Sequence, residues 1–160
     1  MNQQKKSSVL LVCMGNICRS PTAEGVLRYK LEVAGLMDRV HLDSAGTHDY
    51  HVGEPPDQRA QEAARKRGYD LSALRARQVS HRDFSEFDLI LAMDRDNFEY
   101  LVRVCPQELR HKVRLFLSFS SRFSDQEVPD PYYGGSQGFD HVLDMVEDAS
   151  EGLIAALRQA

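Results

Sequence analysis

The sequence predicts a single-domain α/β protein in which four parallel strands form a doubly wound sheet with helices on both faces. Three observations support this class. Short apolar runs alternate along the chain with longer segments whose apolar residues recur at helical spacing. The 160 residues are 42% hydrophobic and 28% charged, as in ordinary globular proteins, and they suffice for one core. No repeat, low-complexity tract or linker interrupts residues 1–160, so one domain is expected.

The first strand is predicted from an apolar run, and the first helix from a Ser-Pro pair that follows it. Residues 8–13 (SVLLVC) form a continuous apolar run, typical of a strand buried on both faces. Ser20 followed by Pro21 is expected to be the N-cap and first position of a helix, which Gly35 ends. The loop between these two elements lies at the carboxyl end of a strand, where open parallel sheets bind their ligands.

The other six elements alternate in the same way. A strand, a helix, a strand, a helix, a strand and a helix are predicted in order at residues 40–46, 55–68, 88–93, 94–106, 113–116 and 139–157. Asp94 can cap the fourth of these, and Pro106 stops it. Cys105 falls on the inward stripe of that helix and is expected in the core.

The composition restricts the class of partner. Lys and Arg number 20 against 24 Asp and Glu, a net charge of −4, without the basic footprint of a nucleic-acid binder. No apolar run approaches the roughly 20 residues of a membrane span, and the start lacks a signal peptide, so a cytoplasmic protein is expected. Seven basic residues fall within 57–82, while eight acids and no Lys or Arg fall within 123–157. Two explanations of this asymmetry are open: solvated helix faces, or a long-range electrostatic field that steers a charged partner protein.

The loop at residues 13–20 (CMGNICRS) has the residue types of a phosphate cradle. Backbone N–H groups of such a loop, and of the helix that follows, can converge on an anion. Gly15 and Asn16 tolerate the left-handed backbone that tight curvature needs. Arg19 offers a planar fork for two phosphate oxygens. The sequence therefore predicts an oxyanion site here.

Cys13 is the candidate nucleophile of this loop. The positive groups around it should lower its thiol pKa from about 8.5 into the range of roughly 3.5–7.5 found for activated cysteines. The alternative is an inert cysteine at a strand end, which the neighbouring glycine, arginine and serine disfavour. With three cysteines and no disulfide framework, a reducing compartment is expected.

Further motifs make the chain resemble a known family. The loop at 12–21 is joined by residues 43–47 (DSAGT), 53–59 (GEPPDQR), 75–78 (RARQ), 87–94 (FDLILAMD) and 130–134 (DPYYG). Together these resemble the low-molecular-weight protein tyrosine phosphatases over nearly the whole chain. The resemblance implies a flavodoxin-like fold, no cofactor and no metal, and tyrosine-phosphorylated protein substrates, with a tyrosine kinase as one candidate. A monomer is the simplest expectation.

The resemblance also implies a two-step mechanism. Cys13 would attack phosphorus and form a cysteinyl-phosphate, which water then hydrolyses. Arg19 and the loop amides would stabilise the transferring group, and Ser20 would bond the sulfur and help it leave. Asp130 matches the general acid that protonates the leaving phenolate and then activates water. By itself, Asp130 before a proline reads as a turn opener.

Other matched positions shape the loop. The phosphate-binding loop would comprise Met14, Gly15, Asn16, Ile17, Cys18 and Ser20. Asn16 and Ser44 match positions that hold the loop in shape. Many family members have a histidine where this chain has Leu74, so the hydrogen-bond network behind the loop should differ in detail.

Substrate preference is implied by aromatic residues. Tyr50, Tyr132 and Tyr133 match positions around the pocket mouth, where they suit a flat phenyl phosphate. Ile17 favours phosphotyrosine over phosphoarginine, since phosphoarginine enzymes tend to have threonine there. Cys18 matches a second cysteine that can form a reversible, protective disulfide with Cys13.

Alternative functions and sites are each disfavoured. An arsenate reductase of the same fold would need a downstream cysteine pair, and Cys105 is the only cysteine left over. A non-catalytic phosphoprotein-binding module would be expected to lack Cys13 or Asp130. His48 and His51 lie three apart without a third ligand nearby, so they are expected on the surface rather than at a metal.

Overall fold

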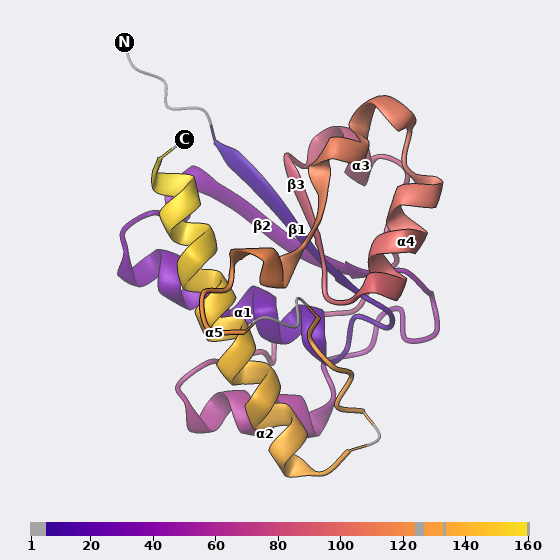
Figure 1. The fold of residues 1–160 in the computed structure, drawn as a ribbon. Helices are drawn as coiled ribbons and strands as arrows, with labels where there is room; N and C mark the ends of the chain where they lie inside the picture. The colour runs from indigo at the N-terminus through magenta and orange to yellow at the C-terminus, as the bar shows by residue number, and fades with distance from the viewer. Residues whose placement is uncertain (1–5, 124–126, 133, 160) are drawn as a thin grey trace.

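The computed structural model describes residues 6–123, 127–132 and 134–159. Its strands are β1 (Ser7–Cys13), β2 (Val40–Gly46), β3 (Leu89–Ala92) and β4 (Val113–Leu115), and its helices are α1 (Arg19–Val33), α2 (Gln58–Lys66), α3 (Asp83–Glu86), α4 (Arg95–Val104) and α5 (Ser136–Arg158). All strand pairs are parallel, in the order β2-β1-β3-β4. The predicted four-stranded, doubly wound, single-domain fold is confirmed (Figure 1).

The buried strand β1 separates two hydrophobic layers. Its alternate residues Val9 and Leu11 pack with α1 and α5, whereas Leu10 and Val12 pack with α3 and α4. Because successive side chains of a strand point to opposite faces, β1 must be apolar throughout, as its sequence is. Figure 1 shows α1, α2 and α5 on one side of the sheet and α3 and α4 on the other.

Two local predictions need correction. Helix α1 begins at Arg19 with Cys18 as its N-cap, so Ser20 is not the cap and Pro21 is not the first helical residue. The hydroxyl of Ser20 is hydrogen-bonded to the preceding loop instead, which leaves the helix to begin earlier. The short helix α3 was not predicted. Cys105 is buried as expected, although it lies at the C-cap of α4 rather than within the helix.

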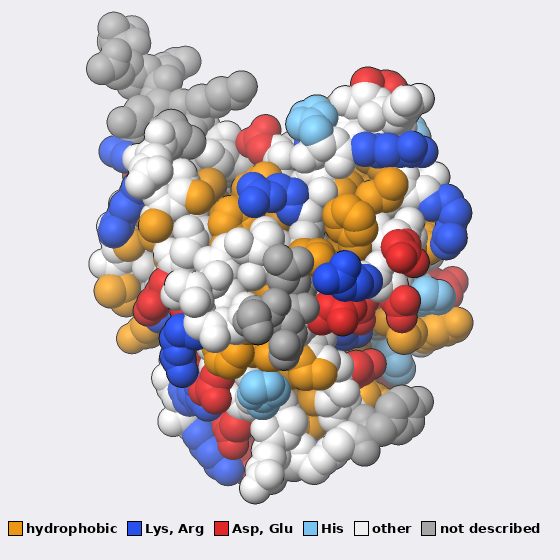
Figure 2. Space-filling model, viewed as in Figure 1, with side chains coloured by type: hydrophobic (Ala, Val, Ile, Leu, Met, Phe, Trp, Pro, Cys, Tyr) orange, Lys and Arg blue, Asp and Glu red, His pale blue; other side chains and the backbone are white. Residues whose placement is uncertain are grey.

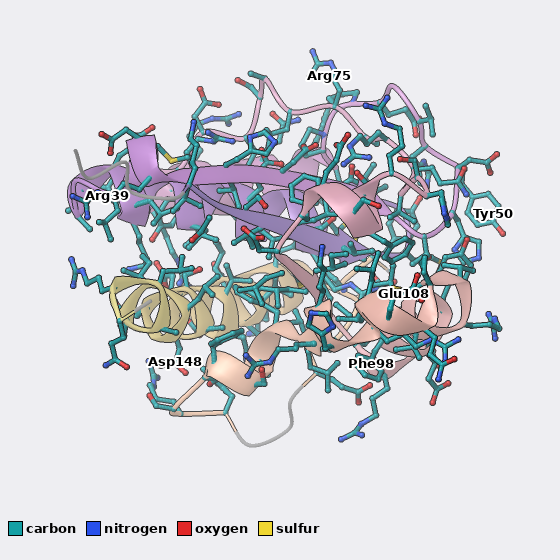
Figure 3. The ribbon with its side chains drawn as sticks, turned by 90° about the horizontal axis from the view of Figure 1, so that it is seen from above. Arg39, Tyr50, Arg75, Phe98, Glu108 and Asp148 are labelled. Atoms are coloured by element: carbon teal, nitrogen blue, oxygen red, sulfur yellow. The ribbon has the colours of Figure 1, made fainter. Side chains whose placement is uncertain are left out.

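The carboxyl ends of the strands define the functional edge of the sheet. Seen from above, Tyr50, which follows β2, lies at one end of the molecule, while Arg39, which precedes β2, lies at the other (Figure 3). The loops that leave β1, β2 and β3 therefore meet at the edge where the sequence predicts a site.

Among the described helices, none is long and apolar enough to span a bilayer.

Candidate active site

The loop from β1 to α1 wraps around the sulfur of Cys13. Ser20 Oγ lies 3.0 Å from Cys13 Sγ, and the backbone N–H of Asn16 donates to the same sulfur at 3.3 Å. The cysteine itself is 3% exposed. The loop thus places a hydroxyl and a backbone amide within hydrogen-bonding distance of a buried sulfur.

Curvature in this loop comes from Asn16 rather than Gly15. In the described part of the chain, Asn16 is the only non-glycine residue with positive φ, at 59°. The backbone of Gly15 does not adopt the left-handed conformation, so the need for a glycine there has a different cause. A Cβ at Gly15 would lie 3.0 Å from the ring atom Cδ2 of His51, so a side chain there would crowd the histidine.

A polar network behind the loop holds Asn16 in this strained conformation. Its Nδ2 group donates to Ser20 Oγ at 2.7 Å and to Ser44 Oγ at 3.0 Å, and its Oδ1 accepts from the backbone N–H of Arg77 at 3.0 Å. The amide is therefore joined to the first turn of α1, to β2 and to the segment before α3. This supports the predicted structural role of Asn16 and Ser44, since a buried amide with all these bonds has one orientation.

The network ends on Glu24, which the sequence analysis missed. Ser44 Oγ donates to Glu24 Oε1 at 2.7 Å, and Arg28 Nη2 donates to Glu24 Oε2 at 3.0 Å. Burial of the carboxyl raises the pKa of Glu24, and the hydrogen bonds from Ser44 and Arg28 oppose that shift. Leu74 lies at the edge of the hydrophobic core, packed against apolar side chains. The carboxylate of Glu24 thus completes a network that includes no histidine.

Arg19 is the buried cation of the site. Its side chain is 3% exposed, and its Nη1 donates to Asp94 Oδ2 at 2.6 Å and to the carbonyl of Val128 at 3.0 Å. Burial alone would lower the pKa of Arg19, but the Cys13 sulfur and the Asp94 carboxylate raise it above its usual range. Asp94 was predicted only as the cap of α4, and it does accept from Asn97 N at 2.8 Å. Its second oxygen orients the guanidinium.

Asp130 reaches the same guanidinium from a later loop. Its Oδ2 lies 3.8 Å from Arg19 Nη2, and its side chain is 40% exposed. The backbone N–H of Tyr132 donates to Asp130 Oδ1 at 3.0 Å, which forms a turn of the type that Asp before Pro predicts. The turn brings a carboxyl to the pocket that Cys13 and Arg19 share.

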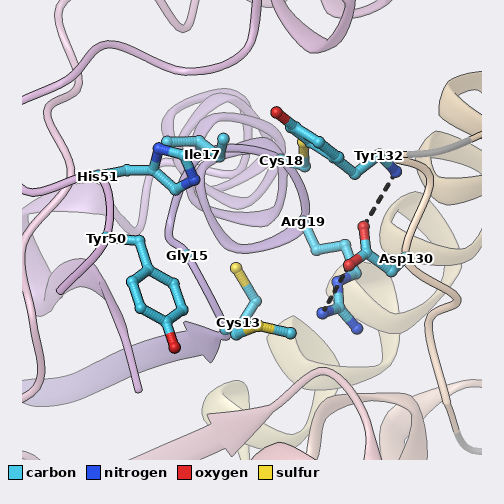
Figure 4. A pocket seen from close by; sticks show the side chains of 10 residues that line it. Cys13, Gly15, Ile17, Cys18, Arg19, Tyr50, His51, Asp130 and Tyr132 are labelled. Atoms are coloured by element: carbon cyan, nitrogen blue, oxygen red, sulfur yellow. Dashed lines mark hydrogen bonds and ion pairs between the residues drawn. The ribbon is translucent and has the colours of Figure 1, made fainter. Parts of the chain in front are cut away.

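These residues line a single pocket of about 230 Å³ (Figure 4). Its lining is Cys13, Met14, Gly15, Ile17, Cys18, Arg19, Tyr50, His51, Asp130 and Tyr132. Most predicted site residues therefore meet in one place, while the side chains of Asn16, Ser20 and Ser44 do not line the pocket and instead hydrogen-bond to one another behind it. Tyr133 lies outside the described residues. His51 is partly exposed, with 31% of its side chain accessible, and it also lines the pocket, a role that was not predicted; its Nδ1 contacts Glu54 Oε2.

Cys18 lies in the pocket wall as a neutral thiol. Burial, with the nearby Asp57 carboxylate, raises the pKa of Cys18 to about 12. Cys13 and Cys18 are both free thiols in this structure. In the described ranges, no three His, Cys, Asp or Glu side chains gather in a way that could hold a metal ion.

The arrangement suits an oxyanion beside a sulfur nucleophile, and comparison with known proteins identifies the family. Residues 8–160 match the family model described as low molecular weight phosphotyrosine protein phosphatase. The chain belongs to this family. The predicted family and the predicted enzyme class, a protein tyrosine phosphatase, are both confirmed.

Individual relatives match over nearly the full length of the phosphatase. The low molecular weight protein-tyrosine-phosphatase of Streptomyces coelicolor is 47% identical over 154 residues, which are 94% of this chain and 93% of the relative. A protein tyrosine phosphatase of Entamoeba histolytica superposes with a TM-score of 0.94 at 42% identity, covering 96% of this chain and 98% of that one. Wzb of Vibrio vulnificus, solved with benzylphosphonate, superposes at 0.80 with 30% identity, covering 94% and 98%.

Proposed function

We propose that this phosphatase hydrolyses phosphotyrosine in proteins through a cysteinyl-phosphate on Cys13, within one catalytic domain spanning residues 1–160. The observation that carries the proposal is the meeting of a sulfur, a buried guanidinium and a carboxyl at one pocket. Cys13, Arg19 and Asp130 come from three separate elements, so their convergence requires the fold. These are the three groups that phosphoryl transfer from an aryl ester needs.

In the first step, the thiolate of Cys13 attacks phosphorus and the bond from phosphorus to the phenolic oxygen of tyrosine breaks. Arg19 and the loop amides bind the equatorial oxygens, where the charge of the transferring group develops. Asp130 donates a proton to the departing oxygen, so that phenol rather than phenolate is released. The Asp94 carboxylate and the Val128 carbonyl support this step because they hold the guanidinium in one orientation.

In the second step, water attacks the phosphorus of the cysteinyl-phosphate and the sulfur leaves. Asp130, now ionised, accepts a proton from that water. Ser20 Oγ, 3.0 Å from the sulfur, donates to the departing thiolate and stabilises it. The enzyme returns to its starting state with inorganic phosphate released.

The pocket walls favour an aryl phosphate. Tyr50 and Tyr132 border the pocket with Ile17, and such surfaces suit a flat ring held above the phosphate. The related Wzb was solved with benzylphosphonate, an aryl analogue of this kind. A phosphate on the short side chain of serine would place its peptide against these walls. Nothing favours an arsenate reductase, since Cys105 packs on the opposite face of the sheet from Cys13.

We also propose that Cys18 protects the nucleophile. Peroxide oxidises the Cys13 thiolate to a sulfenic acid, and attack by the Cys18 sulfur expels water and forms a disulfide. Both cysteines line one pocket, which supports the pairing. A tyrosine kinase as substrate, a monomeric state and a cytoplasmic location stay predictions.

The decisive experiment is an assay in EDTA with phosphotyrosine, phosphoserine and phosphoarginine peptides. Wild type should cleave phosphotyrosine, whereas Cys13→Ser should lose turnover and keep vanadate binding. Asp130→Asn should slow cleavage by about 10²- to 10⁴-fold, the usual scale for acid catalysis. After peroxide, wild type should recover with a thiol reductant and Cys18→Ser should not. If Cys13→Ser kept activity within tenfold of wild type, Cys13 would be excluded as the nucleophile.

A further inference from the structure

Arg59 is an exposed arginine that connects the phosphate loop to the loop of Asp130. It lies in the first turn of α2, and its side chain is 47% exposed. It is not part of the pocket lining, and no step proposed above uses it. Its neighbours nevertheless belong to both sides of the site.

On one side, Arg59 is held by Asp57, which is anchored to the phosphate loop. The backbone N–H of Asp57 donates to the carbonyl of Ile17 at 2.8 Å. The Asp57 carboxylate caps α2 by accepting from Arg59 N at 2.8 Å. It also accepts from the same arginine's Nε at 3.1 Å and Nη2 at 3.0 Å. Bidentate pairing of this kind fixes the plane of a guanidinium.

On the other side, the guanidinium lies over two aromatic rings. Its Cζ atom is 5.3 Å from the ring centre of Tyr132 and 4.9 Å from that of Phe139 in α5. Distances below about 6 Å give an attractive contact between a cation and the face of a ring. The Tyr132 wall of the pocket is thereby tied, through Arg59 and Asp57, to Ile17 in the phosphate loop.

Tyr132 in turn holds Asp130. Its backbone N–H donates to Asp130 Oδ1 at 3.0 Å, while the other carboxyl oxygen lies 3.8 Å from Arg19. A general acid must be held within hydrogen-bond distance of the leaving oxygen, so a small displacement of this turn lowers the rate of the protonation step. Interactions that fix the position of Tyr132 therefore also fix the position of the Asp130 carboxyl.

We propose that Arg59 is a positioning residue for the general acid: by stacking on Tyr132 while paired to Asp57, it sets the distance between Asp130 and the phosphate loop. This inference rests on the proposed function, because it assumes that Asp130 protonates the leaving group. It assigns Arg59 no contact with substrate. The cation acts through Tyr132 alone.

The first test compares two substrates that differ in their need for an acid. Phenyl phosphate has a basic leaving group that requires protonation, whereas 4-nitrophenyl phosphate has one that leaves readily as an anion. Arg59→Ala should lower kcat/KM, which reports only the steps up to departure of the phenol, by about 5- to 10-fold for phenyl phosphate and by less than about twofold for 4-nitrophenyl phosphate. Equal losses on both substrates would overturn the proposal, because a general structural defect affects both.

Arg75→Ala is the matched control. Arg75 is also an exposed arginine, and it donates to the carbonyls of Ser72 and Leu74 in its own loop. It should leave the ratio of the two kcat/KM values unchanged. Arg59→Lys gives a second variant should Arg59→Ala not fold; it lacks the planar fork and should shift the ratio in the same direction by a smaller factor. A ratio equal to wild type in every folded Arg59 variant would contradict the proposal.

A double-mutant cycle tests the route. If Arg59 acts through the ring of Tyr132, then Arg59→Ala should have no further effect on the ratio of the two kcat/KM values in a Tyr132→Leu background. Independent, multiplying effects would overturn the proposed route. Asp130→Asn separates this inference from the proposed function. If Asp130→Asn fails to slow phenyl phosphate selectively, the general-acid assignment fails; if only the Arg59 variants fail to do so, the positioning role alone is wrong.

Discussion

Glu24 shows how a single buried carboxylate can organise a loop that it does not touch directly. It accepts a hydrogen bond from Ser44, which accepts one from Asn16, the residue with the left-handed backbone. Glu24 is 4% exposed, and a buried carboxylate is costly even when hydrogen-bonded. The orientation of the phosphate loop therefore depends on a charge that lowers the stability of the fold at neutral pH.

Replacing this carboxylate should change how stability depends on pH. Burial holds the pKa of Glu24 above its ordinary value of 4.5. In the pH interval between that ordinary value, which applies to the unfolded chain, and the raised pKa of the folded state, the folded protein keeps a proton that the unfolded chain has released. The free energy of unfolding therefore falls as pH rises through that interval. Glu24→Gln removes this pH dependence and keeps a side-chain oxygen that can accept from Ser44. The free energy of unfolding of the variant, relative to that of wild type, should therefore increase as pH rises.

Urea unfolding between about pH 4 and pH 7 measures this difference. Glu32→Gln, an exposed position on the same helix, is the control and should run parallel to wild type. Parallel curves for Glu24→Gln and wild type would show that the carboxyl titrates alike in both states.

At the scale of elements, the junction of β3 and α4 performs two tasks with one side chain. One oxygen of Asp94 caps α4 by accepting from Asn97 N, and the other accepts from Arg19 Nη1. A helix end is thus joined to the buried cation of the active site. Its aspartate cannot be exchanged for another capping residue without loss of the arginine contact.

Asp94→Ser and Asp94→Ala should separate these two tasks. Serine retains the cap, so Asp94→Ala should be less stable than Asp94→Ser by about 1 kcal/mol in urea unfolding. Both variants leave Arg19 without this carboxylate, so inorganic phosphate should inhibit both more weakly than wild type. Asp96→Ser, which removes an exposed acid in the same turn, should leave phosphate inhibition unchanged. Strong phosphate binding by Asp94→Ser would assign Asp94 to the cap alone.

At the scale of the whole molecule, the basic segment at residues 57–82 and the acidic segment at residues 123–157 meet where the C-terminal end of α2 packs on α5. Arg67 lies within 2.9 Å of Asp144, 2.7 Å of Glu147 and 3.7 Å of Asp140. Figure 2 shows blue and red side chains interleaved at the lower left, where α2 and α5 meet in Figure 1. Part of the charge asymmetry therefore serves to dock the last helix rather than to steer a partner.

Removing this cation should weaken the docking of α5 in a salt-dependent way. Arg67→Ala leaves three carboxylates facing one another, so the free energy of unfolding should fall by about 1 kcal/mol at low salt. The loss should shrink at high ionic strength, where surface charges are screened. Arg65→Ala, an exposed neighbour, should have little effect at either salt concentration. A loss independent of salt would assign the role of Arg67 to packing instead.

The sequence by itself determined the fold class and placed Cys13 and Arg19 in the loop that lines the pocket. Apolar runs such as residues 8–13 indicate buried parallel strands, and a cysteine loop after the first strand indicates the ligand edge. These inferences succeed because hydrophobic periodicity and loop chemistry are local properties. The spacing of Cys13 and Arg19 is visible in seven consecutive residues.

Only the tertiary structure decided which distant side chains support those residues. Glu24 reads as a polar residue of a helix, Asp94 as a cap and His51 as a surface histidine, and no local pattern joins any of them to the loop. Their roles depend on where the chain returns, since hydrogen bonds and ion pairs act over a few ångströms in space whatever the separation in sequence. Asp94 lies 75 positions from Arg19 and 2.6 Å from its guanidinium, a proximity that only the folded sheet creates.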